Sequence, residues 1–263
     1  MKFFKAVFSS GGKALSSLNT FGGSPPKQDW LRSFFEEPRA FFCGNSLSRG
    51  QFYSFGRFLR DAGLLSKKDL TPFAERIRIF GWDREAALGL MLVNLVVANV
   101  QFRWFVENLS LDEVVSRMEI ESKLLSVGIT KNSAQAILRS FGRLAQTAFG
   151  SVLKFGKVTY IGRRLATLTR TKAKVTDGRV ILYSLYKFAE VYGGRQFTLS
   201  ELFEVAISPA KIFGLSVEEL EQFLNGLSAN CPEFLDATFT HDLEKISLMP
   251  SKTSADVLRL FEG

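Results

Sequence analysis

The longest apolar run in the sequence, from Ala86 to Val100, constrains the fold more than any other segment. It is about fifteen residues long and contains Asn94 and Asn99. A membrane-spanning helix needs about twenty predominantly apolar residues, so this run predicts a helix buried in a protein core. Asp83 supplies an N-cap, and we expect the helix to continue as far as Phe105.

Spacing and capping patterns predict further helices over residues 51–65, 71–79, 110–125 and 131–149. The second begins with Thr-Pro, an N-cap followed by a first-turn proline, and the third with the capping box Ser-Leu-Asp-Glu. Gly128 separates the last two of these helices, and the two together form a helix-turn-helix pattern. With 46% hydrophobic residues, the 263-residue chain can bury a sizeable core in one large domain or two small ones.

The pattern changes after Gly150. Residues 152–160 and 165–175 mix β-branched and aromatic residues with Lys and Arg, which indicates an exposed hairpin or extended arm. A helix over residues 180–192 follows. Short helices are then expected at 200–205, 208–214 and 216–227, and strands near 234–239 and 245–248. Helices followed by a hairpin are the order of a winged helix.

The expected fold class is therefore mainly α: a helical domain with a helix-turn-helix-like pair, followed by a winged-helix-like C-terminal unit with a small β-hairpin. Its expected parts are a flexible basic leader (1–40), a helical domain (41–150), a basic arm or hairpin (151–179) and a winged-helix-like acidic C-terminal domain (180–263). No internal repeat is strong enough to indicate a solenoid.

Charge is distributed unevenly along the chain, whose net charge is +8. Residues 196–263 carry four Lys and Arg against eleven Asp and Glu, and residues 1–195 carry thirty against fifteen. A basic body with an acidic end can bind a polyanion with one part and a basic protein partner with the other.

The densest group of cations is the best candidate for binding nucleic acid. Its members are Lys154, Lys157, Arg163, Arg164, Arg170, Lys172, Lys174 and Arg179, with Asp177 the single acid among them. Such a run attracts phosphates and releases their counterions, and Tyr160 could stack on a base or sugar. The alternative is a solvated basic face that keeps the protein soluble.

The predicted helix over residues 131–149 adds Lys131, Arg139 and Arg143 to the candidate nucleic-acid-binding residues. It could lie in a major groove as a recognition helix does. The alternative is an ordinary core helix, because its apolar residues would form one face in either case.

The acidic C-terminal domain is a weaker candidate for binding DNA. Its predicted third helix carries Glu218, Glu219 and Glu221, which phosphate would repel, and its hairpin tip carries His241, Asp242 and Glu244. The three glutamates on the helix are therefore expected to bind a protein partner, with a plain packing unit as the alternative.

Several segments resemble the C-terminal region of large bacterial phosphoadenosine phosphosulfate (PAPS) reductase-like proteins. The matching segments are residues 180–190, 196–200, 208–215 and 239–246, with Trp82, residues 92–95 and 101–104 upstream. The resemblance implies a setting in DNA sulfur modification and anti-phage defence. It departs from the family at residues 10–16, where Ala14 occupies the Asp position of the nucleotide-binding SGGxDS loop.

Residues suited to catalysis or metal binding are few. Cys43, Cys231 and the lone His241 cannot complete a tetrahedral zinc site or an iron–sulfur cluster, so no metal or cofactor is expected. Cys43 has no histidine near it in sequence to activate it, and no catalytic residue is predicted. Two distant thiols without a convincing signal peptide indicate a reducing cytoplasm.

The sequence thus predicts a non-catalytic adaptor that binds nucleic acid, with DNA preferred to RNA. The adaptor is also expected to bind a protein of a modification or defence complex, and no membrane attachment is expected. Two alternatives remain open: a purely structural assembly subunit, and a split or degenerate PAPS reductase-like nucleotide-binding protein that uses residues 10–16.

Overall fold

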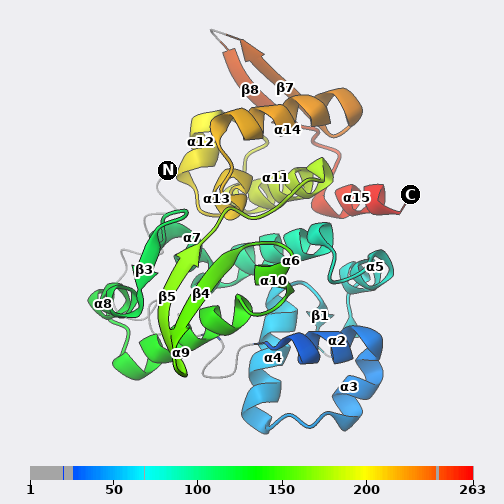
Figure 1. Cartoon of the computed structure of the whole chain (residues 1–263). Coiled ribbons are helices and arrows are strands. Elements are labelled where there is room, and N and C mark those ends of the chain that lie inside the picture. The colour runs from blue at the N-terminus through cyan, green and yellow to red at the C-terminus, as the bar shows by residue number, and fades with distance from the viewer. Residues whose placement is uncertain (1–19, 21–25, 68, 241–242, 263) are drawn as a thin grey trace.

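The computed structural model describes Thr20 and residues 26–67, 69–240 and 243–262, and it confirms a mainly α fold with small antiparallel sheets (Figure 1). Residues 10–16, 241 and 242 lie outside the described part of the chain. The described α-helices are α2 (Gln28–Glu36), α3 (Pro38–Gly44), α4 (Arg49–Asp61), α5 (Pro72–Phe80), α6 (Glu85–Ala98), α7 (Val100–Asn108), α8 (Arg117–Ser126), α9 (Lys131–Leu144), α10 (Ala148–Ser151), α11 (Gly178–Tyr192), α12 (Leu199–Glu204), α13 (Pro209–Phe213), α14 (Val217–Asn230) and α15 (Ser254–Leu258).

The described strands form three antiparallel sheets. The smallest pairs β1 (Leu65–Ser66) with β2 (Asp69–Leu70). The second has the order β3-β5-β4, and its strands are β3 (Val114–Ser116), β4 (Gly156–Ile161) and β5 (Arg164–Arg170). The third has the order β6-β8-β7, and its strands are β6 (Gln196–Phe197), β7 (Leu235–Thr240) and β8 (Leu243–Leu248).

The chain contains the same order of elements twice. Residues 100–170 hold α7, β3, α8, α9, β4 and β5, with α10 inserted before β4; residues 178–248 hold α11, β6, α12 to α14, β7 and β8. In both, the first strand pairs with the third and the third with the second. The second set covers the residues for which the sequence predicts a winged-helix-like unit. The first set repeats its topology.

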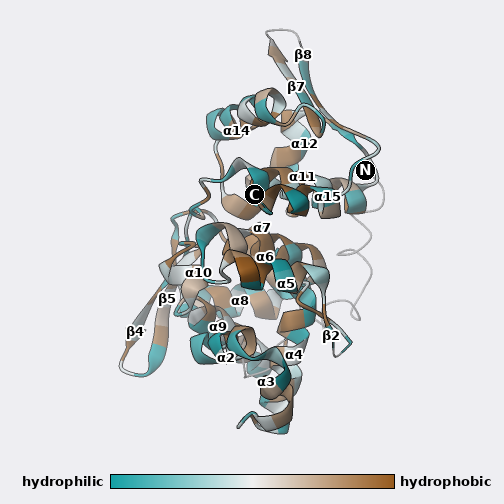
Figure 2. Cartoon of the chain, turned by 90° about the vertical axis from the view of Figure 1, so that its right-hand side faces the viewer, coloured by the Kyte–Doolittle hydropathy of each residue, from teal (hydrophilic) through white to brown (hydrophobic). Residues whose placement is uncertain are grey.

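These two units differ in charge. Residues 100–170 contain eleven Lys and Arg against five Asp and Glu, whereas residues 178–248 contain five against ten. We call them the basic unit and the acidic unit. Their hairpins, β4–β5 and β7–β8, project from the body toward opposite ends of the molecule (Figure 2).

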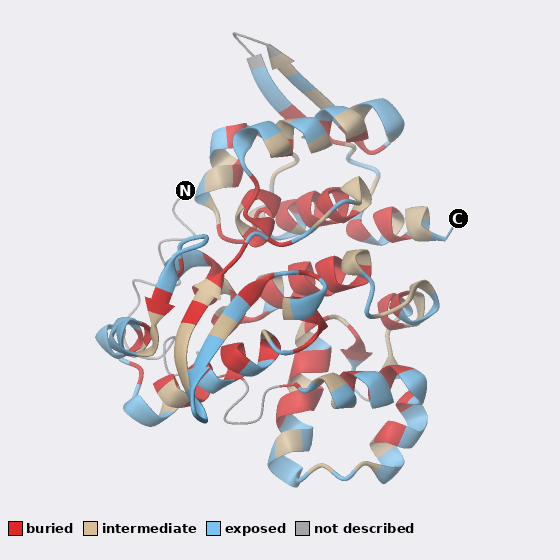
Figure 3. Cartoon of the chain, in the orientation of Figure 1, coloured by how far each residue is buried: buried red, intermediate tan, exposed pale blue. Residues whose placement is uncertain are grey.

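Helix α11 joins the acidic unit to the rest of the molecule, because it lies between α14 and α6 (Figure 1). Both α6 and α11 are buried along most of their length (Figure 3). A Cβ atom at Gly89 would lie 2.9 Å from Val180 Cγ1, so the absence of a side chain allows this close approach. Tyr183 Oη donates to Asn94 Oδ1 at 2.8 Å, and Asn94 Nδ2 donates to the carbonyl of Ala62 at 3.1 Å. The polar residue within the apolar run is therefore satisfied inside the core.

The predicted single helix over residues 83–105 is wrong in its shape. The apolar run is a buried core helix, but α6 ends at Ala98, and α7 continues at an angle of 98°. Asn99 causes the break by capping α7: its Oδ1 accepts from the backbone N–H groups of Gln101 at 2.9 Å and Phe102 at 3.3 Å. In the described residues, no single helix is long and apolar enough to cross a membrane.

The prediction of a helix starting at Ser110 is also wrong. Helix α8 begins at Arg117, and the capping box that starts it is formed by Ser116 and Glu119. Residues 114–116 instead form β3, in which Val115 pairs with Leu168 of β5. The helix predicted over residues 131–149 begins as expected after Thr130 but ends at Leu144.

The predicted flexible leader does not extend to residue 40. Residues 28–44 form α2 and α3, and Leu31 and Phe34 are completely buried. Thr20 is buried too, and its hydroxyl hydrogen-bonds to Gln101 Oε1 at 3.0 Å. The N-terminal helices are therefore part of the core.

Candidate nucleic-acid interface

Helix α9 presents cations on one face and packs with the other. Its N-terminus is fixed by Thr130, whose hydroxyl accepts from the Ser133 N–H at 3.4 Å. The buried face includes Ile137 and Phe141. Lys131, Arg139 and Arg143 are exposed. The three α9 cations of the sequence-based prediction therefore lie in solvent.

The β4–β5 hairpin lies against α9. A Cβ atom at Gly142 would lie 3.1 Å from Tyr160 Oη and 3.2 Å from Leu165 Cδ1, so the hairpin approaches the helix where a side chain is missing. Burial raises the pKa of Tyr160, and the nearby Arg143 guanidinium opposes this rise. The predicted stacking residue Tyr160 and the predicted recognition-helix residue Arg143 are thus neighbours on one surface.

Four cations of the predicted basic stretch are exposed and could contact phosphate. Lys154 lies before β4, Lys157 lies within β4, and Arg163 and Arg164 form the end of the hairpin. All four are exposed, and within the described residues no ion pair includes any of them. Together with the α9 cations they make seven exposed cations on α9 and around β4–β5, which we call the basic surface.

Arg170, by contrast, is buried, with only 4% of its surface exposed. Its guanidinium donates to the carbonyls of Val106 at 2.8 Å and Leu109 at 3.2 Å, and also to the carbonyl of Lys211 in α13. Burial lowers the pKa of Arg170 to about 10. Its prediction as a phosphate-binding residue does not fit this placement, because it joins the basic unit to the acidic unit.

The remaining three cations of the stretch are held in ion pairs. Lys172 pairs with Glu219 of α14. Lys174 Nζ lies 3.3 Å from Glu85 Oε2 at the start of α6. Arg179 pairs with the adjacent Asp177, and its guanidinium carbon lies 4.4 Å from the centre of the Phe261 ring. Residues 170–179 therefore form a connecting segment between the two units and the core, distinct from the basic surface.

The predicted partner-binding glutamates are also divided by the structure. Glu219 completes a capping box by accepting from the Ser216 N–H at 3.0 Å, and Lys172 together with this bond holds its pKa below its usual value. Glu218 is exposed and Glu221 is half-buried. Glu219 is thus held in an ion pair within the chain, whereas no ion pair of the described residues includes Glu218 or Glu221.

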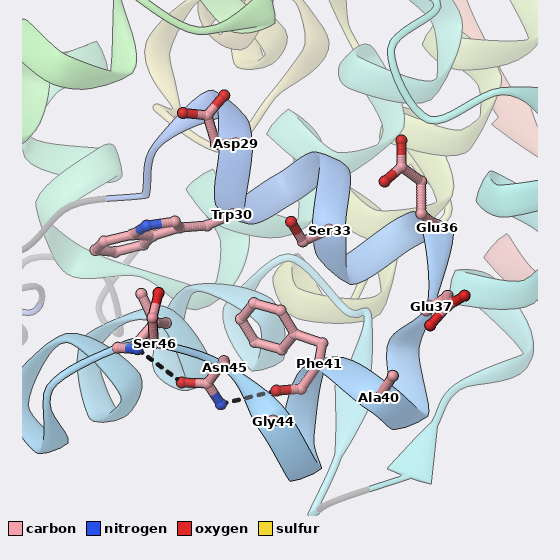
Figure 4. Close-up of a pocket in the computed structure, with 11 residues that line it drawn as sticks. Asp29, Trp30, Ser33, Glu36, Glu37, Ala40, Phe41, Gly44, Asn45 and Ser46 are labelled. Carbon is pink, nitrogen blue, oxygen red and sulfur yellow. Dashed lines mark hydrogen bonds between the residues drawn. The ribbon is translucent and has the colours of Figure 1, made fainter.

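A groove of about 920 Å³ opens between α2, α3 and the loop that follows α3 (Figure 4). Trp30 and Phe41 line it together with the carboxylates of Asp29, Glu36 and Glu37. Carboxylates repel phosphate, so this groove does not extend the basic surface. The described part of the chain contains no group of three His, Cys, Asp or Glu side chains placed to hold a metal ion.

Sequence reasoning missed two residues of this region. Gly142 permits the contact between hairpin and helix, and Ile161 at the hairpin end is 78% exposed. Neither has a local sequence signal that points to its role, because each depends on how the hairpin folds onto α9.

Two crystal structures of SspB, one of them with bound magnesium, have a similar fold. Each aligns with a TM-score of 0.69 over 92% of this chain and 87% of the SspB chain. The chains share a fold. Sequence identity is 14% for the magnesium-bound structure and 13% for the other, so the similarity extends to the fold alone. No protein-family model and no curated protein matches the sequence.

The match to SspB takes in most of both units, because each unit is much larger than the 8% of the chain left unaligned. Most of residues 100–170 and of residues 178–248 thus belongs to the fold shared with SspB.

Proposed function

We propose that the chain is a non-catalytic nucleic-acid-binding adaptor of a bacterial DNA-modification or anti-phage defence complex. The observation that carries this proposal is the basic surface: seven exposed cations on α9 and around β4–β5, without an ion-pair partner in the described residues. One-signed charge at this density repels itself, and a polyanion relieves that repulsion.

The shape of the basic unit favours duplex DNA as the ligand over a polyanion without regular structure. Helices α8 and α9 form a helix-turn-helix pair, and β4–β5 adds a projecting hairpin beside it (Figure 2). A 14-residue helix such as α9 can lie in the major groove of DNA, which admits an α-helix. Near its N-terminus, the exposed Lys131 and Asn132 are types of side chain that hydrogen-bond to phosphates or bases.

The proposed setting rests on the resemblance to PAPS reductase-like proteins and on the fold shared with SspB. In this proposal the acidic unit binds a basic protein partner through Glu218 and Glu221, and another subunit supplies the chemistry. Charge complementarity of this kind favours specific and rapid association.

A salt series tests nucleic-acid binding directly. Fluorescence anisotropy with labelled duplex DNA should show affinity that falls steeply with salt. Replacing Lys157, Arg163 and Arg164 with Ser should make the slope of log affinity against log salt shallower by about 2.7, at ~0.9 for each phosphate that the protein no longer neutralises. All three side chains are exposed, so the fold should persist.

The matched control replaces Arg32, Arg39 and Arg49 with Ser, which removes the same charge from exposed positions in α2, α3 and α4. An equal reduction of the slope in this control would mean that net charge, rather than the basic surface, determines binding. Absence of binding by the parent protein at low salt would contradict the proposal and favour a purely structural assembly subunit.

A further inference from the structure

An exposed apolar side chain lies next to the turn of the β4–β5 hairpin. Ile161 is the last residue of β4, is 78% exposed and pairs across the hairpin with Arg164. Between them lie Gly162 and Arg163, and Gly162 has a φ of 58°. A two-residue turn with glycine at its first position and a positive φ there has the pattern of a type II′ turn. This tight turn places Ile161 directly beside the end of the hairpin, across from Arg164 and two residues before Arg163.

Exposure alone does not distinguish Ile161, since single exposed apolar residues are common on protein surfaces. Ile79 on α5 is 84% exposed, but its neighbours in the sequence, Arg78 and Phe80, are respectively in an ion pair with Glu75 and packed against Phe261. Ile161, by contrast, is followed within three residues by two exposed arginines that are not in any ion pair of the described chain.

The hairpin is held firmly behind this tip. Its pairing register shifts between Thr159 and Tyr160, and such a bulge bends and twists the strand. Thr159 and Thr167 hydrogen-bond across the strands through their hydroxyls at 2.6 Å. Tyr160 rests on α9 where Gly142 leaves space. The end of the hairpin therefore projects from strands that are fixed by these contacts. A side chain that displaces stacked bases needs such a rigid base.

We propose that Ile161 is a wedge that enters the minor groove of duplex DNA and partly separates two stacked base pairs, while Arg163 and Arg164 contact the flanking phosphates. Apolar side chains inserted in this way unstack a base step and kink the duplex. The preferred substrate is duplex DNA with a flexible pyrimidine–purine step such as TA, because that step is the easiest to deform. This inference rests on the nucleic-acid-binding function proposed above.

The proposal assigns separate effects to neighbouring residues. The arginines supply affinity that depends on salt and not on sequence, because phosphate contacts carry no sequence information. The isoleucine supplies deformation and, through it, a preference for the flexible step. Removing one kind of side chain should leave the effect of the other in place.

The test uses the full chain and a short duplex with 2-aminopurine, a base whose fluorescence rises when it unstacks, next to a central TA step. Donor and acceptor dyes at the duplex ends report bending. The parent protein should raise the 2-aminopurine signal, bring the ends together and prefer the TA duplex over a GC-centred one by about fivefold.

Ile161→Ala should abolish the fluorescence rise, the bend and the TA preference, while the salt slope stays at the parent value. Ile161→Phe should retain the unstacking signal, since Phe is also an effective wedge. Arg163→Ser with Arg164→Ser should make the salt slope shallower by about 1.8. Ile79→Ala, which removes an equally exposed isoleucine from α5, should behave like the parent protein.

The outcomes separate this inference from the proposed function. If the parent binds with a steep salt slope but neither unstacks nor bends the duplex, or if Ile161→Ala does both as well as the parent, the wedge is overturned and nucleic-acid binding stands. If the parent binds no duplex at low salt, both are overturned.

Discussion

Lys172 and Glu219 form an ion pair with each other, although the sequence favours opposite roles for them. The basic stretch predicts that Lys172 binds phosphate, and the acidic helix predicts that Glu219 binds a protein partner. Their pairing connects residues 170–179 to α14. Charges that look available in the sequence are here used to hold the two units together.

The cations of the chain therefore fall into two groups, one that holds the fold together and one that is exposed. Arg170 and Lys172 bind groups of the acidic unit, and Lys174 pairs with Glu85 of α6. The open cations lie on α9 and β4–β5, whose hairpin points away from the β7–β8 end of the molecule (Figure 2). The proposed nucleic-acid site and the proposed partner site therefore use different residues.

Glu219→Ala should lower the stability of the chain more than Glu218→Ala. Glu219 completes the capping box of α14 and pairs with Lys172, whereas Glu218 lies one position earlier and is exposed. Loss of the hydrogen bond from the Ser216 N–H costs about 0.5–1.5 kcal/mol, and loss of a half-exposed ion pair adds less than about 1 kcal/mol. Urea denaturation of both variants measures the difference, and equal midpoints would contradict the role given to Glu219.

Arg170→Ala should destabilise the fold strongly. It removes the guanidinium that donates to the carbonyls of Val106, Leu109 and Lys211. Each buried acceptor left without a partner costs about 1–3 kcal/mol, so the destabilisation should reach roughly 3 kcal/mol or more. Arg164→Ala removes the same side chain from an exposed position and serves as the control. Similar midpoints in urea for the two variants would show that Arg170 is not a structural residue.

The ends of several helices could be predicted from the sequence, because local side chains cap them. Thr71, Thr130, Ser208 and Ser216 each cap the helix that was expected to begin beside them. The prediction at Ser110 failed because a second Ser-x-x-Glu pattern begins at Ser116, and the choice between the two depends on the pairing of β3 with the distant β5. Such long-range pairing has no local signal.

The candidate site was predictable in composition but not in geometry. A count of charges treats Arg164 and Arg170 alike, yet the first is exposed at a turn and the second is buried and bound to an α13 carbonyl. The repeated topology of the two units was invisible for a similar reason. It resides in strand order, while their surfaces have opposite charge and no common sequence pattern.

Acid should remove the contribution of the Glu219 charge. Its pKa in the folded chain is lowered from the usual 4.5, chiefly by Lys172. A carboxyl with a depressed folded pKa stabilises above its unfolded pKa and loses this effect as pH falls through the lower folded value. Glu219→Gln keeps a capping amide but removes the charge. The difference in melting temperature between parent and variant should be full above pH 4.5, vanish in stronger acid and shrink in high salt.

Partner binding should depend on Glu218 and Glu221, the two glutamates of α14 that the ion pair with Lys172 leaves open. Changing both to Lys, with Glu219 intact, should abolish recovery of the native partner in a pull-down of the complex. Reversed charge at an interface repels a basic partner and slows association. The melting curve should stay close to that of the parent, because surface substitutions seldom alter stability much.

The matched control for this docking test changes Glu36 and Glu37 to Lys, an equal reversal of charge on the carboxylate-lined groove beside α2 and α3 (Figure 4). Because carboxylates also line this groove, it is an alternative surface for a basic partner. Loss of the partner in the control alone would place docking in the groove and contradict docking through α14. Loss in the α14 variant alone, with DNA affinity unchanged, would show that the acidic unit binds protein independently of the basic surface.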